Sequence, residues 1–142
     1  MAYAILQDLI DDFGAAELVA LSDRADPPTG QIDTSVIDKA LAGADAQING
    51  YLAGRYALPL SETPDLVRDI AVALAIYDLH RYETPELVRE KQKTARAQLK
   101  DIADGKLVLD LAGKELPGSG ATGVQVTDRD RPLDPEKLSG FI

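Results

Sequence analysis

The stretch IAVALAIY, residues 70–77, places eight apolar residues in a row and decides the fold. A helix that is apolar on every side is buried on most of them. Thr63-Pro64 lies just upstream, and this pair predicts a helix start with Thr63 as the cap and Pro64 as the first helical residue. We therefore predict that this helix forms the core of the domain, or of an oligomer.

Four more helices are predicted around it, at residues 5–13, 15–21, 34 to about 56, and from Thr84-Pro85-Glu86 to Gly105. Thr34 or Asp33 is expected to cap the third helix, which should end near residues 55–57 because Pro59 disfavours helix at Leu58. Its apolar stripe comprises Val36, Ile37, Ala40, Leu41, Ala44, Ile48, Tyr51 and Leu52. The stripe of the last helix comprises Leu87, Val88, Ala95, Leu99 and Ile102. The predicted fold class is all-α, a compact bundle of three long and two short helices with an extended C-terminal tail.

The texture of the sequence changes near Gly113, and we predict a helical domain over residues 1–112 followed by a linker and tail over 113–142. KELPGSGATG, residues 114–123, is rich in Gly, Ser and Pro, as linkers are. Apolar and basic residues return after it, which favours a tail that folds onto a partner, with a frayed terminus as the alternative. The candidate partner-binding residues of this tail are Arg129, Arg131, Leu133, Leu138, Phe141 and Ile142.

The composition excludes several classes of protein. A net charge of -9 argues against a nucleic-acid binder that grips phosphates, and the absence of Cys removes thiolate metal sites and cysteine nucleophiles. No apolar run is long enough for a membrane span, and the N-terminus lacks the basic region of a signal peptide. Charge is also uneven, since residues 1–35 are acidic and residues 81–100 basic. These segments are either ordinary solvated faces or surfaces that orient neighbouring copies.

A search for catalytic or metal-binding groups predicts no enzyme, no cofactor and no metal site. His80 is the only histidine, and at the end of a buried helix it is expected to pack or cap. GSGATG at 118–123 lacks the ending of a phosphate loop. The loop at 23–33 resembles a damaged calcium loop, because Pro28 and Thr34 stand where Gly and Glu are required, so an acidic capped turn is the preferred interpretation.

Several blocks together resemble the phage Mu gp36-like family of neck proteins. They are LSD at 21–23, IDTSVIDKALAGADAQI at 32–48, INGYLAGRYALPL at 48–60, YDLHRY at 77–82 and RDRPLDPEKLSGF at 129–141. The resemblance covers nearly the whole chain, and YLAGRYALPL is its most specific block. The sequence departs from the family pattern at Pro27-Pro28, which puts any cation role of the 23–33 loop in doubt.

The resemblance implies a virion structural protein of the neck, a head–tail connector subunit of the adaptor or head-completion kind. It implies a homo-oligomeric ring, with a dodecamer as one candidate, below the portal protein and above tail-completion or stopper proteins. DNA would pass through without specific binding, no membrane would be involved, and the subunit would be made in the cytoplasm of a bacterial host. The alternative is a cytoplasmic helical protein-binding module with a partner-docking tail.

The family block also marks a corner where the third helix ends. Its residues are Tyr51, Arg55, Tyr56, Leu58 and Pro59. We expect them to pack and to form hydrogen bonds at this corner, and an interface role remains open.

Overall fold

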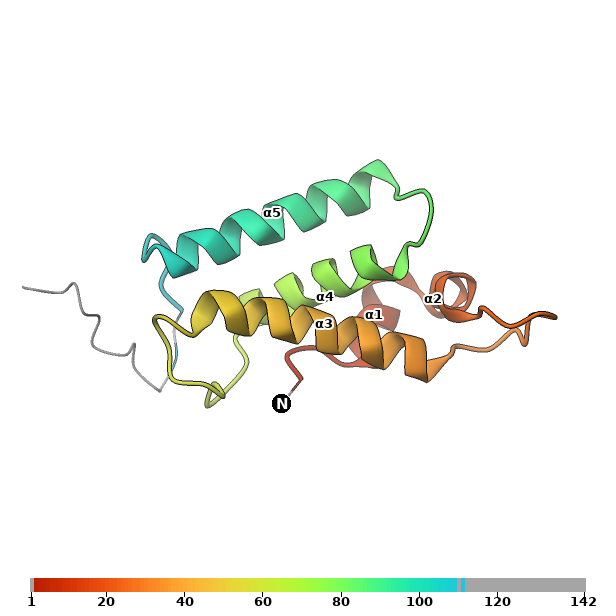
Figure 1. Cartoon of the computed structure of the whole chain (residues 1–142), viewed down its shortest axis with the longest axis horizontal. Helices are drawn as coiled ribbons and strands as arrows, with labels where there is room; N and C mark the ends of the chain where they lie inside the picture. Colours follow the sequence, from red (N-terminus) through yellow and green to blue (C-terminus); the bar gives the residue numbers. More distant parts are fainter. Residues whose placement is uncertain (1, 110, 112–142) are drawn as a thin grey trace, which may run out of the picture.

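The computed structural model describes residues 2–109 and residue 111, and the regular elements among them are five helices. They are α1 (Leu6–Phe13), α2 (Ala15–Ser22), α3 (Thr34–Leu52), α4 (Asp65–Leu79) and α5 (Glu86–Ala103). The long helices α3, α4 and α5 run antiparallel to their neighbours in the chain, and α1 and α2 lie against one end of this bundle (Figure 1). The predicted all-α class, with three long and two short helices, is confirmed.

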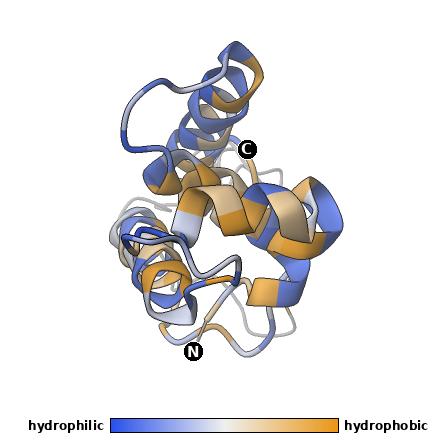
Figure 2. Cartoon of the chain, turned by 90° about the vertical axis from the view of Figure 1, so that its right-hand side faces the viewer, coloured by the Kyte–Doolittle hydropathy of each residue, from blue (hydrophilic) through white to orange (hydrophobic). Residues whose placement is uncertain are grey.

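Helix α4 is the centre of the core, as its apolar sequence predicted. Every residue from Ile70 to Ile76 is buried, and α4 packs against both α3 and α5. Buried apolar side chains of α1, α2, α3 and α5 belong to the same core. The ribbon in Figure 2 shows hydrophobic and hydrophilic residues alternating along these helices. Burial of each large apolar side chain stabilises the fold by roughly 1.5–3 kcal/mol. The buried residues 70–76 of α4 therefore contribute more to the stability than the exposed ends of this helix.

The segment before α1 is held on α3 by a buried tyrosine that the sequence pattern did not single out. The Tyr3 amide donates to Asp45 Oδ1 at 3.0 Å, and the Tyr3 hydroxyl donates to Asn49. Asp45 and Asn49 lie beside the apolar stripe of α3 and are partly buried. Burial raises the pKa of the Asp45 carboxyl, and the Tyr3 amide partly offsets this increase.

The helix ends differ from prediction by a few residues. Pro64 and Pro85 have extended backbones and act as N-caps, so α4 begins at Asp65 and α5 at Glu86, and Thr63 is not the cap. Asp33, rather than Thr34, caps α3 by accepting a hydrogen bond from the Ser35 amide at 3.0 Å. Helix α3 ends at Leu52, and a tight turn to Tyr56 replaces the last predicted turn.

Two members of the predicted apolar stripes are exposed. Leu87 is 66% exposed because it lies about 100° around α5 from Val88, whose side of the helix is the buried one. Tyr51 is exposed because it sits in the last turn of α3, at the edge of the bundle. Residues 107–109 and 111, which follow α5, do not form a strand. Within the part of the chain that the structure describes, no helix could cross a membrane.

Candidate interaction surfaces

The corner after α3 has buried residues as well as exposed ones. Tyr56 is buried, and its hydroxyl oxygen accepts a hydrogen bond of 3.0 Å from the amide of Leu109, which is also buried. The guanidinium of Arg55 lies directly over Gly105, which has a φ of 78°. Arg55 Nε is buried and has no hydrogen-bond partner among the described residues. Tyr56 and Arg55 therefore tie the exit of α3 to the segment that follows α5.

The other three residues of the family corner lie at the surface. Tyr51, Leu58 and Pro59 are exposed, while the next residue, Leu60, is buried and anchors the segment. The corner thus separates into a buried half, which holds the fold, and an exposed half, which is free for contacts.

Aspartate side chains at both ends of the 23–33 loop accept hydrogen bonds from nearby amides. Asp23 Oδ2 accepts from the Gly30 amide at 2.7 Å, and this bond lowers the pKa of Asp23. The Ser35 hydroxyl is the main cause of the lowered pKa of Asp33. The buried Ser22 hydroxyl joins the loop base by donating to the Leu18 carbonyl and accepting from the Asp33 amide. Sequence reasoning missed Ser22, because a serine at a helix end carries no signal of burial.

His80 is the C-cap residue of α4, and its Nδ1 lies 2.8 Å from the Ile76 carbonyl oxygen. Within residues 2–109 and 111, no group of three or more His, Asp or Glu side chains is arranged to hold a metal ion. Asp11 and Asp12 are both exposed on α1, and Asp11 accepts a hydrogen bond from Gln7.

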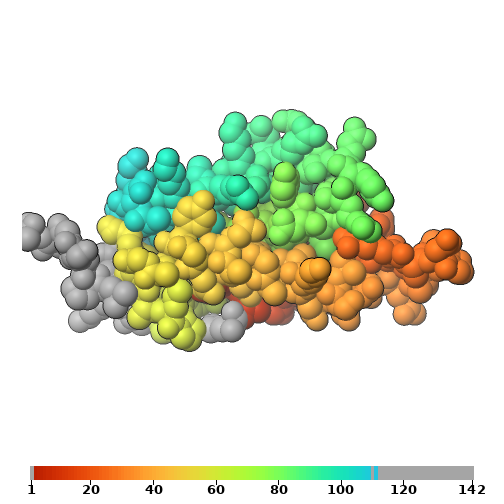
Figure 3. Space-filling view, viewed as in Figure 1, coloured from red at the N-terminus to blue at the C-terminus, as the bar shows by residue number. Residues whose placement is uncertain are grey.

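One end of the molecule is basic. Arg24, Lys39 and Arg81 surround a groove of about 750 Å³ between the start of α3 and the end of α4, and Asp78 is its one carboxylate among the lining residues. Partial desolvation raises the pKa of Asp78, and Arg96 opposes this effect. The turn between α4 and α5 and the 24–33 loop stand out from this end (Figure 3).

The α4–α5 turn carries the most exposed apolar side chain of the described chain. Tyr82 is 93% exposed, and with Asp23, Arg24 and Arg81 it lines a smaller hollow at the basic end. We call the three residues Arg24, Arg81 and Tyr82 the tyrosine knob. Sequence reasoning noted Tyr82 only as part of a family block, since nothing in its spacing shows that it protrudes.

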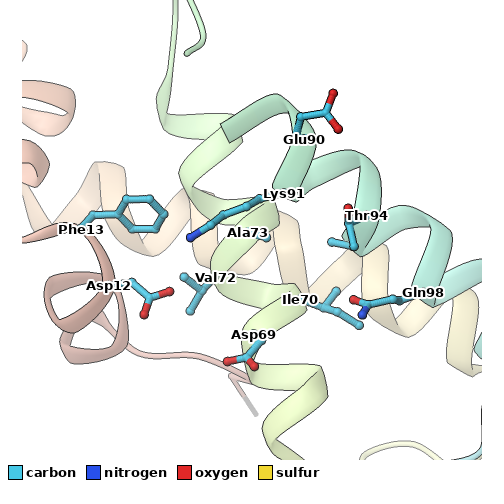
Figure 4. A pocket seen from close by; sticks show the side chains of 11 residues that line it. Asp12, Phe13, Asp69, Ile70, Val72, Ala73, Glu90, Lys91, Thr94 and Gln98 are labelled. Carbon is cyan, nitrogen blue, oxygen red and sulfur yellow. The ribbon is translucent and has the colours of Figure 1, made fainter. Parts of the chain in front are cut away.

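A second groove, of about 470 Å³, lies between α1, α4 and α5, and we call it the acidic groove (Figure 4). Phe13, Ile70, Val72, Ala73 and Ala95 form its apolar part. Asp12, Asp69 and Glu90 are the acidic residues among its lining, and none has an ion pair or hydrogen bond to another described residue. The carboxylate of Glu90 points away from the groove (Figure 4). Its one cation, Lys91, has its ammonium 5.1 Å from the centre of the Phe13 ring, within the range of a cation–π contact.

The candidate tail residues, from Arg129 to Ile142, lie outside the described residues, so their partner-binding role stays a prediction. The same holds for the boundary at residues 112 and 113. The candidate interaction surfaces among the described residues are therefore the corner, the basic end and the acidic groove.

Comparison with known proteins identifies the family of the chain. The model of the family described as Bacteriophage Mu, Gp36 matches residues 3–128. The chain belongs to the Mu Gp36 family. It is similar to gene product J of Escherichia phage Mu, with 29% identity over 142 residues, the full length of both chains. It is also similar to the Mu-like prophage FluMu protein gp36 of Haemophilus influenzae, with 24% identity over 116 residues and 82% of each chain.

Membership in the Mu Gp36 family confirms the resemblance that the sequence blocks indicated, and it makes this chain a phage-type protein. The matched region contains the corner, both grooves and the tyrosine knob. This member of the Mu Gp36 family is thus a small helical bundle with charged surfaces at separate places.

Proposed function

We propose that this protein is a head–tail connector subunit, of the adaptor or head-completion kind. In this proposal it forms a homo-oligomeric ring below the portal and around the DNA channel of a phage particle, and tail-completion or stopper proteins bind on the other side. The observation that carries the proposal is the full-length match to a phage Mu protein, which includes the segment after residue 112 as well as the helices.

The physical character of the subunit supports this role. Its net charge of -9 would repel the phosphates of passing DNA, so that a ring of such subunits can surround DNA without gripping it. Its helices form a small platform in which residues 70–76 of α4 are buried, while charged grooves and an exposed tyrosine remain available at the surface. A platform with several separate contact surfaces is what a subunit between two assemblies needs.

The first test is the location of the protein. Purified phage particles that encode this chain should contain it in many copies by quantitative mass spectrometry, and it should stay with the portal when particles are disrupted. Electron microscopy of the purified chain mixed with portal should show an added ring of density. Absence from particles, together with failure to bind portal, would refute the connector role.

A second test concerns the tail. Deleting residues 129–142 should leave the helices folded by circular dichroism, because the described core closes without them, but should abolish assembly on the portal. Sedimentation of truncated protein with portal at the position of the full-length complex would contradict a docking role for Arg129, Arg131, Leu133, Leu138, Phe141 and Ile142.

A cytoplasmic protein-binding module is the second candidate, and one observation favours it. Helix α5 exposes several cations along one side, namely Arg89, Lys93, Arg96 and Lys100. Such a helix could recognise an acidic protein outside any particle. The particle and portal experiments separate the two, since this module would remain monomeric and absent from virions.

A further inference from the structure

The tyrosine knob and the acidic groove have complementary shape and charge. The knob projects an aromatic ring that is 93% exposed, with Arg24 and Arg81 beside it. The acidic groove is hollow, its floor is apolar, and the carboxylates of Asp12 and Asp69 and the ammonium of Lys91 lie along it (Figure 4). A buried tyrosine contributes about 150–250 Å² of contact area, and Tyr and Arg are the residues that most often dominate the binding energy of an interface.

The charges that this contact requires are free in the described chain. Arg81 has no ion pair with another described residue, and neither do Asp12, Asp69 and Glu90. Lys91, the groove's own cation, has its ammonium close to the Phe13 ring. The groove therefore offers two unpaired carboxylates, Asp12 and Asp69, and an apolar floor. The knob offers two guanidinium groups and an aromatic ring, and the nearby Asp23 carboxylate accepts a hydrogen bond from the Gly30 amide.

The two surfaces lie at different places on one subunit. The acidic groove meets α4 at residues 69–73, whereas Tyr82 follows the C-terminal end of α4 at Leu79. Contact between two different patches is heterologous, and a heterologous contact is the kind that closes into a ring when repeated by rotation. A symmetric dimer contact would instead need one patch that matches itself.

We infer that the tyrosine knob of one copy docks into the acidic groove of a second copy. In this contact the Tyr82 ring lies on the apolar floor next to Phe13 and Ala73, while Arg24 and Arg81 meet the carboxylates of the rim. The inference rests on the proposed ring, and it names the surfaces through which neighbouring subunits of that ring touch.

Cross-linking tests this pairing directly, because the chain has no Cys of its own. Thr94 is exposed and lines the acidic groove. The full-length double variant Glu83→Cys/Thr94→Cys keeps Tyr82 in place and puts a cysteine at the exposed residue next to it. Treated with a short bis-maleimide, it should give a ladder of dimers, trimers and larger species. Each single variant should give dimers at most, since one cysteine per copy cannot extend a chain. Tyr51→Cys/Thr94→Cys is the matched control, with an exposed tyrosine outside the knob, and should give no ladder.

Charge reversal provides a second readout in the uncross-linked protein. Arg81→Glu and Asp69→Lys should each weaken self-association by about tenfold or more, and the double variant should recover most of the loss because the pair is restored with opposite sign. The five residues changed in these tests, Tyr51, Asp69, Arg81, Glu83 and Thr94, are exposed, so the fold should persist.

The inference is overturned if the double cysteine variant gives no ladder, both as purified protein and within phage particles. It is also overturned if Arg81→Glu assembles as the unaltered protein does. The connector role is judged separately, by whether the chain is present in particles, so a ring built through other surfaces would leave that role standing.

Discussion

The Tyr56 hydroxyl oxygen accepts a hydrogen bond from the amide of Leu109, 53 residues away in the sequence. This contact joins the corner after α3 to the segment after α5, the last part of the chain that the structure describes. Both residues are buried, so neither group has water as an alternative partner. The most specific block of the family sequence thus contributes a bond that fixes where the chain leaves the bundle.

Tyr56→Phe should therefore destabilise the protein by about 1–3 kcal/mol, the usual cost of a buried amide left without a partner. Urea denaturation followed by circular dichroism measures this free energy. Tyr51→Phe is the control, because Tyr51 is exposed and has no hydrogen bond to another described residue. Equal stability of the two variants would show that the Leu109 bond contributes nothing.

Arg55 and Gly105 meet at the same joint, and Gly105→Ala should disturb it. A Cβ at Gly105 would lie 2.0 Å from Arg55 Nη2, and the positive φ of this glycine costs other residues about 1–2 kcal/mol. We expect a loss of at least this size in thermal or urea unfolding. Gly54→Ala should change little, since its Cβ would meet nothing within 4 Å.

The double variant Arg55→Ala/Gly105→Ala separates the two causes. If the steric contact matters, the alanine at 105 should cost less when Arg55 is absent than when it is present. An identical cost in both backgrounds would assign the whole effect to the backbone.

The centre of α4 should not tolerate charge. Leu74 is 1% exposed, and Leu74→Asp places a carboxylate in the core without a partner. The penalty of several kcal/mol is comparable with the whole stability of a small domain, so helical circular dichroism should be lost. Leu87→Asp is the matched control at an exposed leucine of α5 and should stay folded. A fully helical Leu74→Asp protein would contradict the assignment of the core.

These contrasts show what the sequence could predict. IAVALAIY identifies a buried helix because no rotation of it exposes a polar side. Tyr51 and Tyr56 stand in one sequence block, yet only Tyr56 is inside, since its burial depends on Leu109. Pro64 and Pro85 each mark a helix start correctly to within one residue, because a proline is compatible with both the cap and the first turn.

The interaction surfaces were the least predictable part. The acidic groove draws residues from α1, α4 and α5, and the knob combines Tyr82 with Arg24 from a distant loop. Local periodicity reports which side of a helix is apolar, but it does not report which helices become neighbours. The charge difference between residues 1–35 and 81–100 was visible in the sequence, whereas the sites at which those charges gather required the fold.

Two aspartates should affect stability with opposite dependence on pH. Burial raises the pKa of Asp45, so its folded form binds a proton more readily than the unfolded chain. Its stabilising contribution is present below the ordinary aspartate pKa of about 3.9 and is lost as the pH rises through the folded value. The Gly30 amide lowers the pKa of Asp23, so its contribution is present above the ordinary value and is lost as the pH falls through the folded one.

Asp45→Asn keeps an acceptor for the Tyr3 amide and removes the buried charge. Its stability relative to the unaltered protein should therefore rise between about pH 4 and pH 7. Asp23→Asn should show the reverse sign in a lower range of pH: its relative loss should be present above about pH 4 and should disappear as the pH falls below the ordinary aspartate pKa. Urea midpoints measured at several pH values from about pH 2 to about pH 7 test both signs. Parallel curves for the two variants would show that neither carboxyl has a pKa that differs between the folded and unfolded states.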